Sequence, residues 1–69
     1  MTIEAKLDRI RERATLYAIL FRNGGVALQF YEAPAAKLTK DWADKLVVHR
    51  FYPTLAEAVD AEMERLGIK

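Results

Sequence analysis

The stretch from residue 15 to residue 32, Thr-Leu-Tyr-Ala-Ile-Leu-Phe-Arg-Asn-Gly-Gly-Val-Ala-Leu-Gln-Phe-Tyr-Glu, contains two runs of aromatic and aliphatic residues around a polar centre. Runs of this composition favour β-strands. The central Asn23-Gly24 pair is a strong hairpin signal, because a type I′ turn needs positive φ at both of its middle positions. We therefore predict strands over 15–22 and 26–32, joined by a two-residue turn.

The length of that turn determines which residues face one another. It sets three cross-strand pairs on one face: Phe21 with Val26, Ile19 with Leu28, and Tyr17 with Phe30. All six residues are apolar or aromatic, whereas a shift by one residue would bring Ala27 and Gln29 into the same face. We predict that these six side chains form the sheet's contribution to the core.

Helices are predicted at both ends of the chain. Residues 2–14 begin with Thr2, a favourable N-cap, and residues 54–66 begin with Thr54, which forms a capping box with Glu57. Gly67 stands where a helix commonly ends in the left-handed conformation. The expected apolar stripes are Ile3, Leu7, Ile10 and Ala14 in the first helix, and Leu55, Val59, Met63 and Leu66, with Ala58 beside them, in the last.

The segment between the hairpin and the last helix is less regular. Residues 45–52 predict a third strand, and residues 33–44 fit either two helical turns after Pro34 or a loop held by Trp42. The expected fold is a single α+β domain over residues 1–69. Its order is αβββα, with a three-stranded antiparallel sheet and both terminal helices packed on one face of that sheet.

Composition excludes several classes of protein. The chain is 69 residues long, has no cysteine, and carries a formal net charge of +1. It therefore lacks the thiols for disulfides or a structural zinc site, and we expect no metal or cofactor. The N-terminus has no signal-peptide pattern and the apolar runs are too short to span a membrane, so we expect a cytoplasmic protein. Because so short a chain buries little core, we also expect a homodimer.

No catalytic set is present in the sequence. His49 is the one histidine and has no nucleophile or orienting carboxylate at a recognisable spacing, so we interpret it as a structural strand residue. Asn23-Gly24-Gly25 leads into a strand rather than a helix, which favours a turn over a phosphate-binding loop. The acids of the last helix are expected on its solvent side: Glu57, Asp60, Glu62 and Glu64. We expect no enzymatic activity.

The second face of the hairpin is unusually apolar for a surface that faces water. Leu16, Ala18, Leu20 and Arg22 should alternate onto it from the first strand, and Ala27, Gln29 and Tyr31 from the second. With both helices on the other face, these side chains are available to a partner. We predict a protein-binding module, a small adaptor or inhibitor, that uses Leu16, Leu20, Arg22 and Tyr31.

A nucleic-acid-binding module is the alternative. The helix–three strands–helix order resembles the double-stranded-RNA-binding fold and the small mRNA interferase toxins built on it. Residues 52–58, Tyr-Pro-Thr-Leu-Ala-Glu-Ala, are similar to the strand-to-helix junction of antitoxins and of recombinase arm-binding sheets. The last helix begins without the basic cluster of the RNA-binding fold, and residues 23–26 lack the toxins' histidine. We therefore expect nucleic-acid binding to be weak at most.

Overall fold

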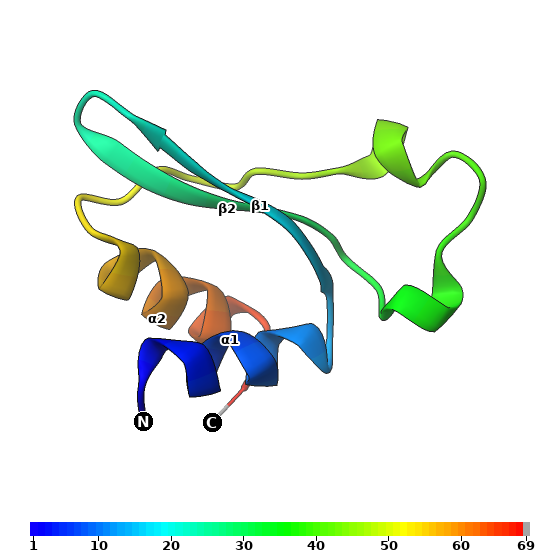
Figure 1. The fold of residues 1–69 in the computed structure, drawn as a ribbon, viewed down its shortest axis with the longest axis horizontal. Helices are drawn as coiled ribbons and strands as arrows, with labels where there is room; N and C mark the ends of the chain where they lie inside the picture. Colours follow the sequence, from blue (N-terminus) through cyan, green and yellow to red (C-terminus); the bar gives the residue numbers. More distant parts are fainter. Residues whose placement is uncertain (69) are drawn as a thin grey trace.

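The computed structural model describes residues 1–68 and contains two helices and one hairpin. Their order is α1 (Ile3–Arg11), β1 (Thr15–Arg22), β2 (Gly25–Tyr31) and α2 (Leu55–Arg65), with two short 3-10 helices, η1 (Ala35–Lys37) and η2 (Trp42–Lys45), before α2. Both α-helices lie on the same side of the hairpin and run in the same direction (Figure 1). The predicted α+β class and one-sided helix layer are confirmed, but the regular sheet has two strands and not three.

The hairpin keeps the predicted register near its turn and loses it further away. Phe21 pairs with Val26 and Ile19 with Leu28, as predicted, but Leu16 pairs with Phe30 because the ladder is irregular between Leu16 and Ala18. Tyr17 is thus an extra residue, a β-bulge, and the predicted pairing of Tyr17 with Phe30 is wrong. Since one extra residue reverses the alternation, Leu16 turns to the helix side and packs against the core.

The turn itself differs from the predicted type. Gly24 has φ of 86°, and no residue other than glycine has positive φ within residues 1–68. Asn23 therefore does not adopt the conformation that a type I′ turn requires. A positive φ at the second middle position alone is typical of a type II turn, which glycine favours there.

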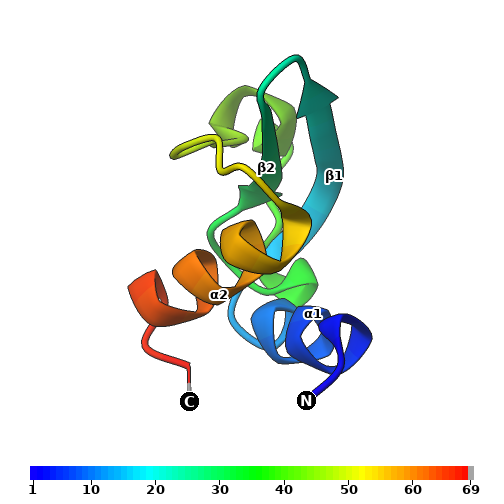
Figure 2. The ribbon, with the colours of Figure 1, turned by 90° about the vertical axis from the view of Figure 1, so that its left-hand side faces the viewer.

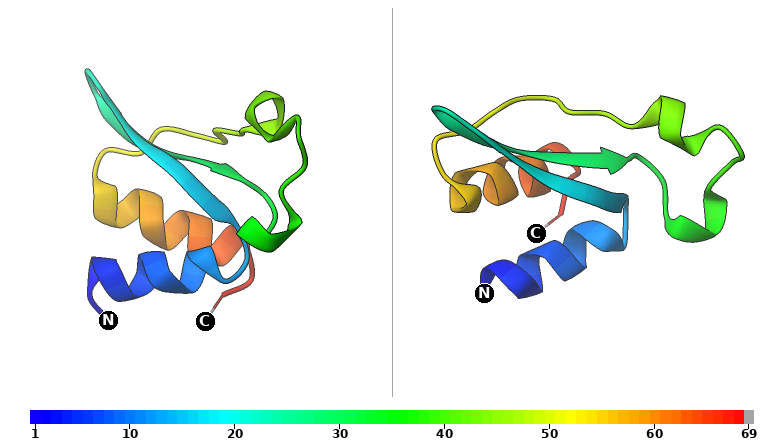
Figure 3. Two further views of the ribbon diagram at one scale, coloured as in Figure 1. Left: turned by 45° about the vertical axis from the view of Figure 1, so that its right-hand side comes forward. Right: turned by 45° about the horizontal axis from the view of Figure 1, so that its top comes forward.

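The predicted third strand, residues 45–52, is a segment tied to β2 at two points. Val26 exchanges both backbone hydrogen bonds with Tyr52, and Phe30 does so with Val47. Between these bridges, four residues (48–51) lie opposite three (27–29), so a continuous ladder cannot form. The segment nonetheless runs beside β2 on the side away from β1 (Figure 3).

Both helix ends follow the local sequence signals. Thr2 Oγ1 accepts a hydrogen bond from the Ala5 N–H at 3.1 Å, and Thr54 Oγ1 accepts one from the Glu57 N–H at 3.2 Å. At the end of α2, Gly67 has φ of 71°, and the Ile68 N–H donates to the Met63 carbonyl at 2.9 Å. These bonds confirm the predicted caps and the Schellman ending of α2.

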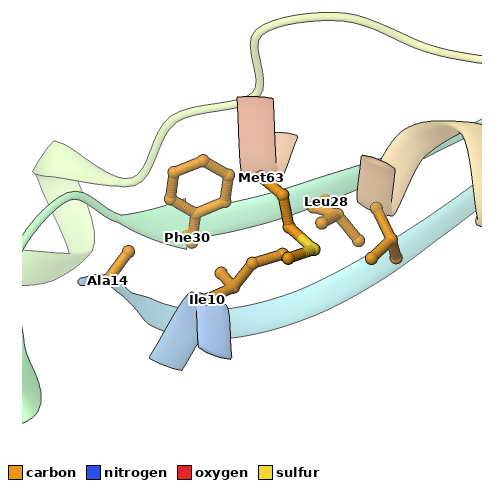
Figure 4. Packing of buried hydrophobic residues seen from close by; sticks show 6 residues of the cluster. Ile10, Ala14, Leu28, Phe30 and Met63 are labelled. Atoms are coloured by element: carbon orange, nitrogen blue, oxygen red, sulfur yellow. The ribbon is translucent and has the colours of Figure 1, made fainter. Parts of the chain in front are cut away.

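The core lies between the hairpin and the two helices. Figure 4 shows its close packing, with Phe30 and Leu28 of β2 facing Met63 of α2 and Ile10 of α1. The buried cluster consists of Ile10, Ala14, Leu28, Phe30, Val59 and Met63. Of the six residues predicted for the core face, Leu28 and Phe30 belong to this cluster, Ile19 packs against it and Val26 is buried beside the turn. The other two are not in the core, because Tyr17 is 57% exposed at the bulge and Phe21 is 71% exposed near the hairpin turn.

Candidate functional site

Both α-helices lie on one side of the sheet, and the opposite face carries apolar side chains that no α-helix of residues 1–68 covers (Figure 1). Because side chains alternate along a strand, the residues of β1 and β2 that lie between the core-facing ones point to this side. In the third segment, Val47 packs against the core, so the next residue, Val48, points the other way and is 36% exposed. This open face comprises Ala18, Leu20, Arg22, Ala27, Gln29, Tyr31, Val48 and Phe51.

A contact with an aromatic ring lies near each end of β1. At the hairpin turn, the Arg22 guanidinium lies 3.8 Å from the centre of the Phe51 ring. Phe51 packs closely over Gly25 and leaves little room for a side chain there, because a Cβ at residue 25 would lie only 3.0 Å from the Phe51 Cβ. At the opposite end, the Tyr17 and Trp42 ring centres are 5.6 Å apart, which joins η2 to the bulge of β1.

The four predicted binding residues do not all lie exposed on the open face. Leu20 lies half-buried on the open face, and Arg22 is exposed at its rim, as the sequence suggested. Leu16 does not belong to this face, because the bulge turns it toward the core. Tyr31 is on this face but is only 9% exposed, so little of its ring is available to a partner.

Sequence reasoning missed the aromatic residues that frame the face. Phe51 falls within the predicted third strand, residues 45–52. Trp42 falls within residues 33–44, for which the sequence fits either helical turns or a loop. The tight approach of Phe51 to Gly25 had one local signal, since a glycine inside a strand often marks close backbone approach. The contact between Trp42 and Tyr17 spans 25 positions, and no spacing rule points to it.

A second arrangement of polar groups lies on the helix side, around Phe30. Glu62 is 2% exposed, so its predicted place on the solvent side of α2 is wrong. Its Oε2 accepts a hydrogen bond from Arg65 Nε at 2.7 Å, and Arg65 Nη1 also bonds Glu32 Oε1 at 2.7 Å. Glu32 Oε1 is in turn 2.8 Å from His49 Nε2. We call these four residues the polar cluster.

Hydrogen bonding shifts the pKa of two members of the polar cluster, Glu32 and Arg65. The hydrogen bond from His49 lowers the pKa of Glu32, and this effect together with that of Arg65 outweighs the opposing effect of burial. Burial favours the neutral form of Arg65, but hydrogen bonds and charge from Glu62 and Glu32 outweigh it and raise the pKa of Arg65. Both groups are therefore charged at neutral pH, and the cluster joins β2, the third segment and α2.

The hydroxyl side chains of the chain lie outside the polar cluster. The chain contains neither serine nor cysteine. All four threonine hydroxyls have structural partners: Thr2 and Thr54 cap the helices, Thr15 donates to the Ala33 carbonyl, and Thr39 bonds Asp41. Within residues 1–68, no group of three or more acidic or histidine side chains is arranged to hold a metal ion.

The remaining surface features are small. A half-open cavity of about 170 Å³ lies between the end of α1 and η1, lined by Arg11, Ala14, Thr15, Leu16 and Ala35. Three basic residues that a nucleic acid could contact are engaged by other side chains: Arg22 stacks on Phe51, Arg50 lies 5.5 Å from the Tyr52 ring, and Lys45 lies 3.5 Å from Asp41. Over residues 1–68, no helix has the length and apolar character needed to cross a bilayer.

Comparison with protein-family models, with curated proteins and with solved structures finds no match for this chain.

Proposed function

We propose that the domain is a cytoplasmic, non-enzymatic protein-binding module, an adaptor or inhibitor, that contacts its partner through the open face. One observation carries this proposal: both helices pack on the same side of the sheet (Figure 1), and the alternation of side chains leaves Leu20, Val48 and Phe51 on the other side, each partly exposed. Apolar surface left in water is unfavourable, so a contiguous patch framed by aromatic residues is typical of an interaction site.

The composition of the open face supports protein as the ligand. Aromatic residues and arginine are enriched in protein interfaces, and charged residues are depleted at their centres. Here Leu20 and Val48 lie on the face between the Arg22–Phe51 and Tyr17–Trp42 pairs. We propose Leu20 and Val48 as central contacts and Arg22 as the rim contact.

Affinity capture with two matched baits tests the proposal. Val48→Asp places a charge on the open face, and Ile3→Asp places the same charge at an apolar site of equal exposure (36% against 37%) on α1. Aspartate is favourable in the first turn of a helix, so Ile3→Asp should fold normally. A true partner should be retained by the wild type and by Ile3→Asp in nuclease-treated lysate, and lost with Val48→Asp.

The captured protein should then be purified and titrated against the three chains. Charge at an apolar interface centre should weaken binding at least tenfold, since central contacts contribute about 2 kcal/mol or more. A partner that binds Val48→Asp as tightly as the wild type would refute the assignment of the open face. Capture that disappears on nuclease treatment would favour the nucleic-acid alternative.

A further inference from the structure

The outer edge of β1 carries backbone groups that are not paired within the sheet. Val26 directs both its N–H and its carbonyl to Tyr52, with distances of 2.7 and 2.8 Å, so neither points toward β1. Its neighbour across the hairpin, Phe21, is then in a non-hydrogen-bonded pair, and its own N–H and carbonyl point away from β2. The same alternation applies to Ile19, the partner of Leu28.

Nothing in residues 1–68 covers this edge. Figure 2 shows β1 along the border of the molecule, with the turn projecting beyond the helices. β1 has eight residues, TLYAILFR, and its one charged residue, Arg22, is at the end. Monomeric proteins protect such edges with lysine, proline, inward-pointing charges or β-bulges. Residues 18–21 contain none of these, since the bulge lies before them, at Tyr17.

We infer that the β1 edge is a self-association site, at which two copies of this chain pair antiparallel about a two-fold axis at Leu20. In this register Ile19 of one copy faces Phe21 of the other, and Phe21 faces Ile19. Each of these pairs exchanges two backbone hydrogen bonds, because all four residues point their backbone groups outward. The two hairpins then form one continuous four-stranded sheet.

The alternative two-fold registers leave groups unpaired. An axis at Ile19 would place Phe21 opposite Tyr17, where the bulge interrupts the strand. An axis at Phe21 would place Ile19 opposite Asn23, which belongs to the turn. Only the axis at Leu20 keeps both outward-facing residues of each copy within the regular part of β1, so the edge is complementary to itself.

Side chains and charge agree with a second copy as the partner. Phe21 is 71% exposed in the single chain and would lie against Ile19 of the other copy. Arg22 would lie opposite Ala18, so the two arginines are not brought together. The net charge of +1 per chain produces little repulsion between copies.

Single-cysteine crosslinking tests this pairing in a chain that has no cysteine of its own. Leu20→Cys would place two thiols opposite each other at the axis, in a non-hydrogen-bonded pair with Cβ atoms about 4.5–5.5 Å apart. Leu38→Cys, in the loop between η1 and η2, is the control for random collision. On mild oxidation, Leu20→Cys should form covalent dimer at least ten times faster, and Phe21→Lys in the same chain should abolish this difference.

Sedimentation measures the same self-association without a crosslink. The wild type and Leu38→Lys should sediment as dimers at about 100 μM, a concentration above the Kd of ordinary specific complexes. Phe21→Lys should sediment as a monomer, and its circular dichroism spectrum should show that it is folded. A monomeric wild type at that concentration, or equal crosslinking at Leu20→Cys and Leu38→Cys, would overturn the inference. The inference concerns the edge of the sheet, so its failure would leave partner binding at Val48 untouched.

Discussion

At the residue scale, Glu62 stands out as a charged side chain among the buried residues. A carboxylate that is 2% exposed is costly unless a cation and hydrogen bonds compensate for the lost water. Arg65 supplies both, and its guanidinium also lies 5.1 Å from the centre of the Phe30 ring. The polar cluster therefore depends on Arg65 more than on any other member, since that residue alone contacts both acids.

This dependence predicts unequal effects in a mutant cycle. Arg65→Met should lower the free energy of unfolding by about 3 kcal/mol, because it leaves the buried Glu62 without its cation. Adding Glu62→Met should restore most of that loss, since replacing both members of a buried pair with apolar residues is often neutral. Urea denaturation followed by circular dichroism compares the free energy of unfolding of the wild type, Arg65→Met and the double variant.

Arg11→Met is the control for that cycle. Arg11 pairs with Asp8 at 2.7 Å, but both side chains are more than half exposed, so its loss should change the free energy of unfolding by less than about 1 kcal/mol. If the double substitution were as unstable as Arg65→Met alone, the buried pair would not be the cause of the loss.

At the element scale, the elements with local signals were predictable. Thr2, Thr54 and Gly67 define helix ends through bonds to residues three to five positions away, so their sequence context is sufficient. The hairpin register was correct where Asn23-Gly24 controls it, and failed at Tyr17, five residues from the turn. The aromatic contact of Tyr17 with Trp42 accompanies that bulge, and it joins elements distant in the sequence.

The third segment shows why strand composition did not produce a strand. Residues 45–52 have the aliphatic and aromatic side chains that strands favour. Regular pairing also needs equal numbers of residues between the bridges, and here Val47 and Tyr52 enclose four residues where β2 offers three. The burial of Glu62 was missed although Arg65 is only three positions away, because the same spacing also occurs on a solvent-exposed helix face, as in the pair of Arg11 and Asp8.

Amide hydrogen exchange should show this irregularity directly. The Val47 and Tyr52 N–H groups donate to β2 carbonyls at 2.9 and 2.8 Å and should be protected. The N–H groups of the four intervening residues, 48–51, should exchange faster, because the ladder is interrupted there. Uniform protection from residue 47 to residue 52 would show a regular third strand in solution and contradict the two-bridge arrangement.

At the scale of the whole molecule, one small core supports the entire fold. The hairpin alone would be marginal in water, and its stability comes from the helices packed on one face. Lys6 reaches Asp60 at 2.5 Å, and Arg13 donates to the Leu66 carbonyl at 3.2 Å, so the two helices are also tied to each other. Because no helix packs on the opposite face, packing that is lost between the helices and the sheet is not replaced by a second core.

Two truncations of apolar residues in the same hairpin should therefore differ sharply. Leu28 is 1% exposed and belongs to the buried cluster, so Leu28→Ala should cost about 2–5 kcal/mol, a large part of the stability of a domain this small. Phe21 shares the sheet face of Leu28 in the sequence pattern but is 71% exposed, so Phe21→Ala should change the free energy of unfolding by less than about 1 kcal/mol. Thermal melts compare the two variants at a few micromolar protein, where self-association through the β1 edge adds least to stability. Equal losses of stability would place Phe21 in the core.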